Sequence, residues 1–171
     1  MILVTGATGD IGRALLNELH AYAGVPLRGL TRDAAHAAFP KGVEAVQGDF
    51  AELASLRAGL EGVRSLFLVS RLGSDADIIE AARQAGVEYV VLASSITAQT
   101  HPHLGPAGEN LAVEKLLKQS GMAWTILRPT QFASNTLMWA ATIRKHGTIT
   151  RLMRTLRCRP STPQTLRQWL G

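Results

Sequence analysis

The sequence predicts an α/β fold, a doubly wound parallel sheet of about six strands with helices on both faces. Short apolar runs rich in β-branched residues alternate with longer stretches of helical periodicity, which is the pattern of repeated βαβ units. The chain has 171 residues, of which 46% are hydrophobic and only 5% aromatic, and this mixture suits strands that are buried on both faces. A chain of this length normally makes a single domain.

Apolar segments followed by turn or helix-capping residues are predicted as strands. They span residues 2–5, 26–30, 43–47, 65–69, 89–93 and 124–127. Because parallel strands are joined by right-handed crossovers, we expect the strand order 3-2-1-4-5-6.

Segments of helical periodicity connect these strands. In the first, residues 10–22, Ile11, Leu15 and Leu19 fall on one face of the helix. The others span residues 53–60, 75–85, 108–119 and 131–143. A glycine follows shortly after each of these ends, as is typical where a helix stops in a left-handed conformation.

A glycine-rich turn follows the first predicted strand. Its three glycines have the spacing G-x-x-G-x-x-G between a strand and a helix, which is the context that a dinucleotide-binding turn requires. Glycine allows a tight turn, a close approach of the backbone to a pyrophosphate, and close packing of the helix on the sheet. The residues expected to hold the pyrophosphate, partly through the N–H groups of the helix start, are Gly6, Thr8, Gly9, Asp10, Ile11 and Gly12. This predicts a Rossmann fold that binds NAD(P), and the alternative is an ordinary loop with three glycines.

The second predicted strand ends in Thr31-Arg32-Asp33. An acidic residue at this place would accept hydrogen bonds from the adenosine ribose and select NAD. Arg32 instead can pair with a 2′-phosphate, with Thr31 as a second donor, so NADP(H) is favoured over NAD(H). Two alternatives stay open: Arg32 as a solvated surface residue, and NAD selection by Asp33.

Gly48-Asp49-Phe50 follows the third predicted strand. The Asp49 carboxylate can accept from the adenine amino group, and the Phe50 ring can flank the base. Asp49 can equally serve as the N-cap of the next helix.

Several motifs together resemble the NmrA-like branch of the atypical short-chain dehydrogenases, over residues 1 to about 149. The resemblance is carried by the glycine turn with Val4 and Thr5, Thr31-Arg32-Asp33, Gly48-Asp49-Phe50, Ser94-Ser95, and the stretch from Trp124 through Leu127-Arg128-Pro129 and Phe132 to Asn135. It implies an extended Rossmann fold that binds NADP(H), with adenine contacts from Asp49 and Phe50. It further implies that the ribose and nicotinamide lie near Val69, Ser70, Ala93, Ser94, Pro129 and Phe132. The branch includes quinone and azo reductases and also redox-sensing regulators without enzymatic activity.

A catalytic group is harder to assign. Short-chain dehydrogenases use Tyr-x-x-x-Lys as a proton donor, but the residues four places after Tyr22 and Tyr89 are Pro26 and Ala93. Alignment with the branch puts Asn110 where the lysine would stand. Substitute candidates are Ser94 at the end of the fifth strand, His103 in the following loop, and Asn135 in the last helix. His103 can also be an exposed loop residue, and Asn135 can cap or pack its helix.

The charge is concentrated at the C-terminus. Residues 1–143 carry 11 basic and 13 acidic residues, whereas residues 144–171 carry seven basic residues and no acidic one, within a net charge of +5. We expect a nucleotide-binding domain over residues 1–149 and a basic tail over 150–171 without a clear strand. The loss of pattern favours a disordered tail or a remnant of a substrate lobe over a basic arm for an acidic partner or nucleic acid.

Composition excludes several other classes of protein. The single cysteine, Cys158, rules out a disulfide framework, and no run approaches the ~18 apolar residues of a membrane span. His101 and His103 have no carboxylate or cysteine at ligand spacing, so we expect no metal site. A cytoplasmic protein is therefore predicted, and its oligomeric state is not fixed by the sequence.

The sequence leaves two candidate functions. The first is an NAD(P)H-dependent reductase of a quinone-like or other small carbonyl substrate, because hydride delivery to an electron-poor acceptor depends mainly on positioning. The second is a noncatalytic NADP-binding redox sensor that docks a regulatory protein partner. The sequence favours the reductase only by analogy.

Overall fold

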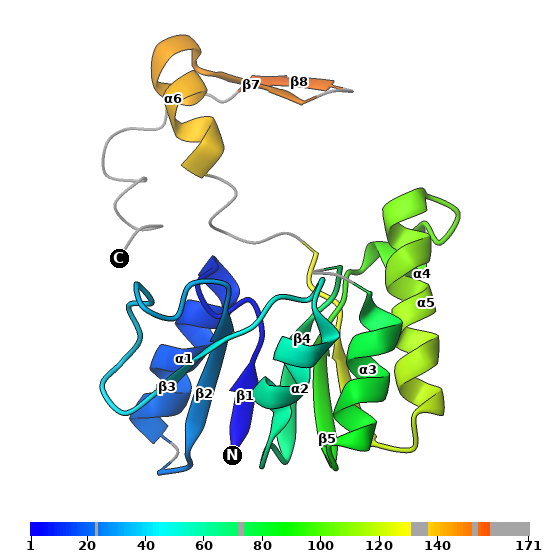
Figure 1. Cartoon of the computed structure of the whole chain (residues 1–171). Helices are drawn as coiled ribbons and strands as arrows, with labels where there is room; N and C mark the ends of the chain where they lie inside the picture. The colour runs from blue at the N-terminus through cyan, green and yellow to red at the C-terminus, as the bar shows by residue number, and fades with distance from the viewer. Residues whose placement is uncertain (23, 72–73, 131–136, 152–153, 158–171) are drawn as a thin grey trace. The chain divides into compact units, whose positions relative to one another are not determined.

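The computed structural model describes residues 1–22, 24–71, 74–130, 137–151 and 154–157. It divides into two compact units, Met1–Thr130 and Gln131–Gly171, and each is described by itself. The first unit is a sheet with helices on both faces (Figure 1).

The sheet of the first unit has six parallel strands in the order β3-β2-β1-β4-β5-β6. The strands are β1 (Ile2–Val4), β2 (Leu27–Thr31), β3 (Glu44–Gln47), β4 (Ser65–Val69), β5 (Tyr89–Ala93) and β6 (Ala123–Leu127). The predicted fold class and strand order are confirmed, and the predicted strand ends differ from these by at most one residue. Since all pairs are parallel, every strand presents its carboxyl end at the same edge of the sheet.

The described residues of the first unit form five helices. They are α1 (Asp10–Tyr22), α2 (Leu53–Leu60), α3 (Asp75–Gln84), α4 (Thr97–Thr100) and α5 (Gly105–Gln119). The short helix α4 was not predicted, and α5 begins three residues before the predicted start at Gly108. Its earlier start includes Pro106 in the first turn, where a missing N–H costs nothing. No side chain caps this helix, so Pro106 was the available starting signal, and the prediction did not use it.

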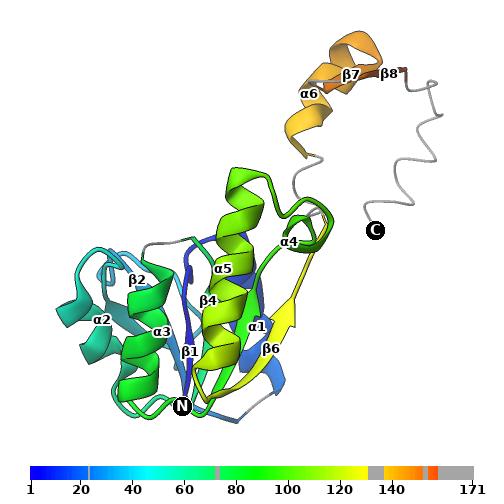
Figure 2. The same ribbon diagram turned by 90° about the vertical axis from the view of Figure 1, so that its right-hand side faces the viewer.

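Two apolar layers hold the sheet, one on each face. On one face, α1 packs through Leu16 against Val4, Leu27 and Phe67. On the other face α2, α3 and α5 pack over alternate strand residues such as Leu30 and Leu68 (Figure 2). The two-residue alternation of a strand therefore sends neighbouring apolar side chains into different layers, which is why the strands read as continuous apolar runs.

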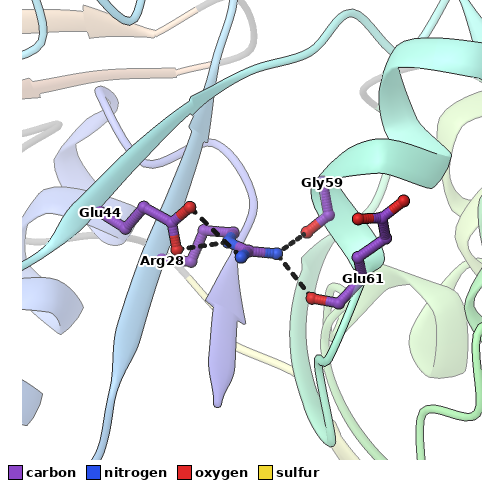
Figure 3. A network of polar contacts seen from close by, with 4 residues as sticks. All are labelled: Arg28, Glu44, Gly59 and Glu61. Carbon is purple, nitrogen blue, oxygen red and sulfur yellow. Dashed lines mark hydrogen bonds and ion pairs between the residues drawn. The ribbon is translucent and has the colours of Figure 1, made fainter.

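A buried arginine joins β2, β3 and the end of α2. Arg28 is only 9% exposed, and its guanidinium forms two hydrogen bonds to the Glu44 carboxylate, of 2.8 and 3.2 Å. It also donates to the carbonyl oxygens of Gly59 and Glu61, each at 2.8 Å (Figure 3). Because these carbonyls lie at the C-terminal end of α2, Arg28 satisfies groups that a helix end leaves unpaired.

The second unit contains a helix and a hairpin. Helix α6 (Leu137–His146) is followed by β7 (Thr148–Arg151), which pairs antiparallel with β8 (Arg154–Arg157). The expectation of no clear strand after residue 150 is therefore wrong for β8. Its segment, Arg154–Arg157, has Leu156 as its one apolar residue and so shows no strand pattern, and the strand is defined by its pairing with β7.

Parts of the predicted C-terminal elements lie outside the described residues. These are residues 131–136 of the last predicted helix and residues 158–171 of the basic tail, including Cys158. The predicted domain boundary after residue 149 stays a prediction. Among the helices that the structure describes, none is both long and apolar enough to cross a membrane.

Candidate nucleotide-binding site

The strand order reverses direction between β1 and β4, and one buried threonine ties these two strands together. Thr5 follows β1 and is fully buried. Its hydroxyl donates to the carbonyl oxygen of Phe67 at 3.0 Å and accepts from the amide of Val69 at 2.9 Å. In open α/β sheets ligands bind outside the carboxyl ends of the strands at this reversal, so Thr5 fixes the floor of the expected site.

The glycine turn after β1 has the geometry that its spacing predicts. Gly6 has a φ of 59°, and the amide of Gly9 donates to its carbonyl oxygen at 2.9 Å. A Cβ on Gly12 would lie 2.3 Å from that same oxygen and 2.8 Å from the Cα of Ala7. A Cβ on Gly9 would lie 3.3 Å from it. A side chain at residue 12 would thus meet backbone that cannot move aside, whereas one at residue 9 would make a tight contact, so the close approach of α1 to the turn depends mainly on Gly12.

The start of α1 offers unpaired amides at this turn. The amide of Arg13 is the first in the helix to bond back, to the carbonyl oxygen of Gly9 at 2.9 Å. Within the described residues, the amides of Asp10, Ile11 and Gly12 have no backbone acceptor. Three N–H groups without acceptors at the positive end of a helix fit a pyrophosphate. The residues present at this turn therefore fit the predicted dinucleotide.

The end of β2 presents one exposed cation. Arg32 is exposed, while Thr31 before it is 8% exposed. The Asp33 carboxylate contacts Nδ1 of His36 at 2.8 Å and also accepts from the His36 amide at 3.2 Å. The Asp33 carboxylate is therefore engaged locally, and Arg32 is an exposed cation next to it at this strand end.

The Gly48-Asp49-Phe50 segment also lies at the carboxyl edge, after β3. Asp49 is exposed, and its Oδ1 accepts from the amide of Ala51 at 2.9 Å. Helix α2 begins only at Leu53 with Glu52 as its N-cap, so Asp49 closes a turn before the helix and is not its cap. Phe50 is half-buried against the α2 layer, which leaves part of its ring accessible.

The loop after β4 is held by α3 and α5. The Ser70 hydroxyl lies 3.0 Å from the Ala93 carbonyl oxygen and 2.8 Å from Oδ1 of Asn110. Arg71 has a φ of 68°, unusual for a residue with a side chain, and its amide donates to both Asp75 oxygens at 3.2 and 3.0 Å. Burial raises the pKa of Asp75, although the amide of Arg71 partly opposes this. The Arg71 guanidinium pairs with Glu109 at 2.8 Å.

A buried carboxylate joins the ends of β5 and β6. Glu114 of α5 is fully buried and accepts from the Ser94 hydroxyl at 2.7 Å. Arg128 donates to its two oxygens at 2.9 and 2.5 Å. These hydrogen bonds, led by the Arg128 guanidinium, hold the pKa of Glu114 below its ordinary value. The backbone stays paired just beyond β5, because the Ser94 amide donates to the Leu127 carbonyl oxygen at 2.8 Å.

The three candidate catalytic residues differ in their exposure and contacts. Ser94 is 8% exposed, and its hydroxyl donates to Glu114. This hydroxyl can therefore donate a proton to another group only after its hydrogen bond to Glu114 breaks. His103 is exposed in the turn before α5, with its ring 6.2 Å from that of His101. Asn135, like the predicted nicotinamide neighbour Phe132, lies outside the described residues. The part of the chain that the structure describes contains no cluster of metal-ligating side chains.

Sequence reasoning missed two polar groups at this edge. Glu114 is not among the predicted site residues, and Asn110 was identified only as the residue at the lysine position. Both lie on the buried side of α5, where a polar residue among apolar neighbours was the available signal.

A strand–glycine turn–helix unit with open helix amides, set at the reversal of a six-stranded parallel sheet, defines a dinucleotide-binding α/β domain. Residues 6–151 match the NAD(P)H-binding family. The chain belongs to this family.

Individual relatives agree with this assignment. The chain is 39% identical to an NAD(P)H azoreductase of Xenophilus azovorans, over 86% of this chain and 54% of that protein. It is 33% identical to quinone oxidoreductase 2 of Escherichia coli, with the same coverage of both chains. The chain thus spans about half the length of the curated relatives it matches.

Solved structures give the same result. The NADPH-dependent quinone oxidoreductase of Escherichia coli in complex with NADPH matches with a TM-score of 0.73 and 33% identity, over 86% of this chain and 55% of that chain. Triphenylmethane reductase of Citrobacter with NADP(H) matches with a TM-score of 0.74 and 25% identity, over 86% and 56%. The predicted resemblance to the NmrA-like reductases is confirmed.

Proposed function

We propose that this chain binds NADP(H) and acts as an NAD(P)H-dependent reductase of a quinone-like or other small electron-poor acceptor. The observation that carries the proposal is the start of α1, where the amides of Asp10, Ile11 and Gly12 have no backbone acceptor among the described residues. The named reductase relatives support the reaction class. Because the chain covers only about half of them, the activity of the whole protein is part of the proposal.

Different residues at the carboxyl edge bind different parts of the cofactor. The turn at Gly9 and the start of α1 hold the pyrophosphate, and Arg32 with Thr31 contacts the 2′-phosphate. Asp49 and Phe50 flank the adenine. Residues for the nicotinamide half are Val69, Ser70, Ala93, Ser94, Pro129 and Phe132. When bound, the dihydronicotinamide supplies the hydride, and the chain's own part is to position it and to exclude water.

Cofactor preference is tested by titrating the chain with NADPH and NADH. We expect tighter binding of NADPH, and we expect Arg32→Ala to weaken NADPH binding by at least about tenfold with little effect on NADH. Arg64→Ala is the matched control, because Arg64 is also exposed but precedes β4 at the opposite edge and pairs with Glu88. Equal losses for both cofactors in Arg32→Ala contradict the phosphate assignment.

Turnover is tested by NADPH oxidation with a panel of quinones and azo compounds. We expect activity that disappears in Gly9→Asp, because a carboxylate at the turn repels the pyrophosphate and crowds the Gly6 carbonyl oxygen. Tight cofactor binding without turnover on any acceptor supports the noncatalytic redox-sensor alternative instead. The candidates Ser94, His103 and Asn135 are compared by alanine substitution in the same assay. The cytoplasmic location stays a prediction.

A further inference from the structure

The two charged side chains that follow β2 differ in what holds them. Arg32 is exposed, and none of the ion pairs within the described residues includes it. The Asp33 side chain is 62% exposed, but its carboxylate already has a partner in His36. The end of this strand therefore presents a cation that can meet a ligand directly, beside an anion that another side chain holds.

His36 contacts the Asp33 carboxylate through its backbone and its ring. The His36 amide donates to Oδ1 at 3.2 Å, and the ring Nδ1 lies 3.0 Å from Oδ1 and 2.8 Å from Oδ2. A carboxylate can only accept, so Nδ1 carries the hydrogen in this contact. Because Nδ1 is close to both oxygens, it occupies the edge of the carboxylate that a pair of hydroxyl groups would use.

This contact is made within one short turn of the connection between β2 and β3. Asp33 and His36 are three residues apart, and the Asp33 amide donates to the Thr31 hydroxyl at 3.3 Å. The His36 amide bonds to Asp33 whatever the side chain at residue 36 is. The histidine ring can therefore be replaced without removing the backbone contact of the turn, and its own contribution can be measured.

Arg32 and Asp33 favour different nucleotides at this strand end. A carboxylate here accepts from the hydroxyls of an adenosine ribose and repels a 2′-phosphate, whereas a guanidinium pairs with that phosphate. Since the two residues are adjacent, the preference of the site depends on which side chain is available to the ribose. The His36 ring occupies Asp33 and leaves Arg32 available.

We propose that His36 is a specificity-determining residue of the nucleotide site and acts through Asp33. By holding the carboxylate, it keeps Asp33 away from the ribose hydroxyls and from Arg32, and Arg32 is left to bind a 2′-phosphate. This inference rests on the proposed nucleotide function and adds a residue to it. Both partners of the contact are exposed, so His36 shifts the preference between NADPH and NADH by a modest factor.

The test measures the ratio of two dissociation constants, Kd for NADH over Kd for NADPH, in the full chain. We expect His36→Leu to lower this ratio by about three- to fivefold, because the released Asp33 favours NADH and disfavours NADPH. His20→Leu is the matched control, since His20 is also exposed but lies in the last turn of α1, away from the carboxyl edge. It should leave the ratio unchanged.

Two further variants separate the proposed role from a general effect on the turn. His36→Asn keeps an N–H donor near the place of Nδ1, so it should retain the ratio of the wild-type chain. In an Asp33→Ala background the carboxylate is gone, so adding His36→Leu should change the ratio no further.

Each other outcome decides against a specific claim. An unchanged ratio in His36→Leu overturns this inference while the nucleotide site stands, and so does a loss in His36→Asn as large as in His36→Leu. A shift that persists in the Asp33→Ala background means that His36 meets the cofactor itself, which overturns the role through Asp33. A wild-type chain that binds neither NADPH nor NADH overturns the proposed nucleotide site, and this inference with it.

Discussion

Glu114 on α5 and Arg128 at the end of β6 form a two-point ion pair whose acidic member is fully buried. The arginine side chain is 31% exposed, so only one half of the pair is removed from water. With Ser94 as a third member, the pair fixes the ends of β5 and β6 relative to α5. A buried pair of this kind sets geometry more reliably than it adds stability.

We predict that Glu114→Gln lowers the free energy of unfolding at neutral pH by about 1–3 kcal/mol, because the amide cannot accept from Arg128 at two oxygens as a carboxylate does. The pKa of Glu114 is below its ordinary value in the fold. Its contribution is therefore complete above the unfolded pKa near 4.5 and is lost as the pH falls through the lower folded value. Urea unfolding from pH 7 to pH 3 checks this, and the difference between wild type and variant should shrink with acid. A pH-independent difference contradicts the assignment.

We predict that Gly12→Ala destabilises the chain by at least about 2 kcal/mol, because the added Cβ meets backbone atoms of the turn that cannot move aside. Gly105→Ala is the matched control, since it also lies in a helix but has open space around its Cα. Chemical denaturation compares the two, and the control should be neutral or slightly stabilising. Equal effects would falsify the close packing of α1 on its turn.

We predict that Arg28→Leu costs about 3 kcal/mol of unfolding free energy, since the buried carbonyl oxygen of Gly59 and the part-buried carbonyl oxygen of Glu61 both lose their donor. Arg64→Leu is the comparison, because its ion pair with Glu88 is exposed on both sides. Exposed pairs contribute at most about 1 kcal/mol. Thermal or urea unfolding of both variants is the measurement, and a cost for Arg28→Leu no larger than for Arg64→Leu runs against the role given to Arg28.

We predict that Thr5→Val, which keeps the shape of the side chain, costs about 1–3 kcal/mol because the amide of Val69 loses its acceptor in the interior. Thr125→Val is the control, since Thr125 bonds the partly exposed Tyr89 hydroxyl near the edge of the sheet. Cofactor titration of Thr5→Val should also show weaker binding, because β1 and β4 meet under the expected pyrophosphate site. A variant as stable as wild type shows that Thr5 does not tie the two strands.

The fold could be predicted because its signals are local and repeated. The apolar runs at Ile2 and Ser65 and the glycines near the helix ends mark where strands and helices begin and end. Right-handed crossovers, together with the glycine turn after the first strand, favour the order of a dinucleotide-binding sheet. Helix α4 was missed because it is one turn long and has no side-chain cap, and the start of α5 was missed because its only local signal is Pro106. The strand at Arg154 was missed because its pairing with β7, rather than its own hydrophobicity, defines it.

The sequence by itself determined the sheet, its strand order and the glycine turn, because the residue spacing and the conformational freedom of glycine act within a few neighbouring residues. Only the tertiary structure decided which polar side chains meet. Ser70 and Asn110 are 40 residues apart, and Ser94 and Glu114 are 20 apart. Their contacts arise because parallel strands bring their carboxyl ends to one edge, under a helix whose buried face must pair every polar group that it carries.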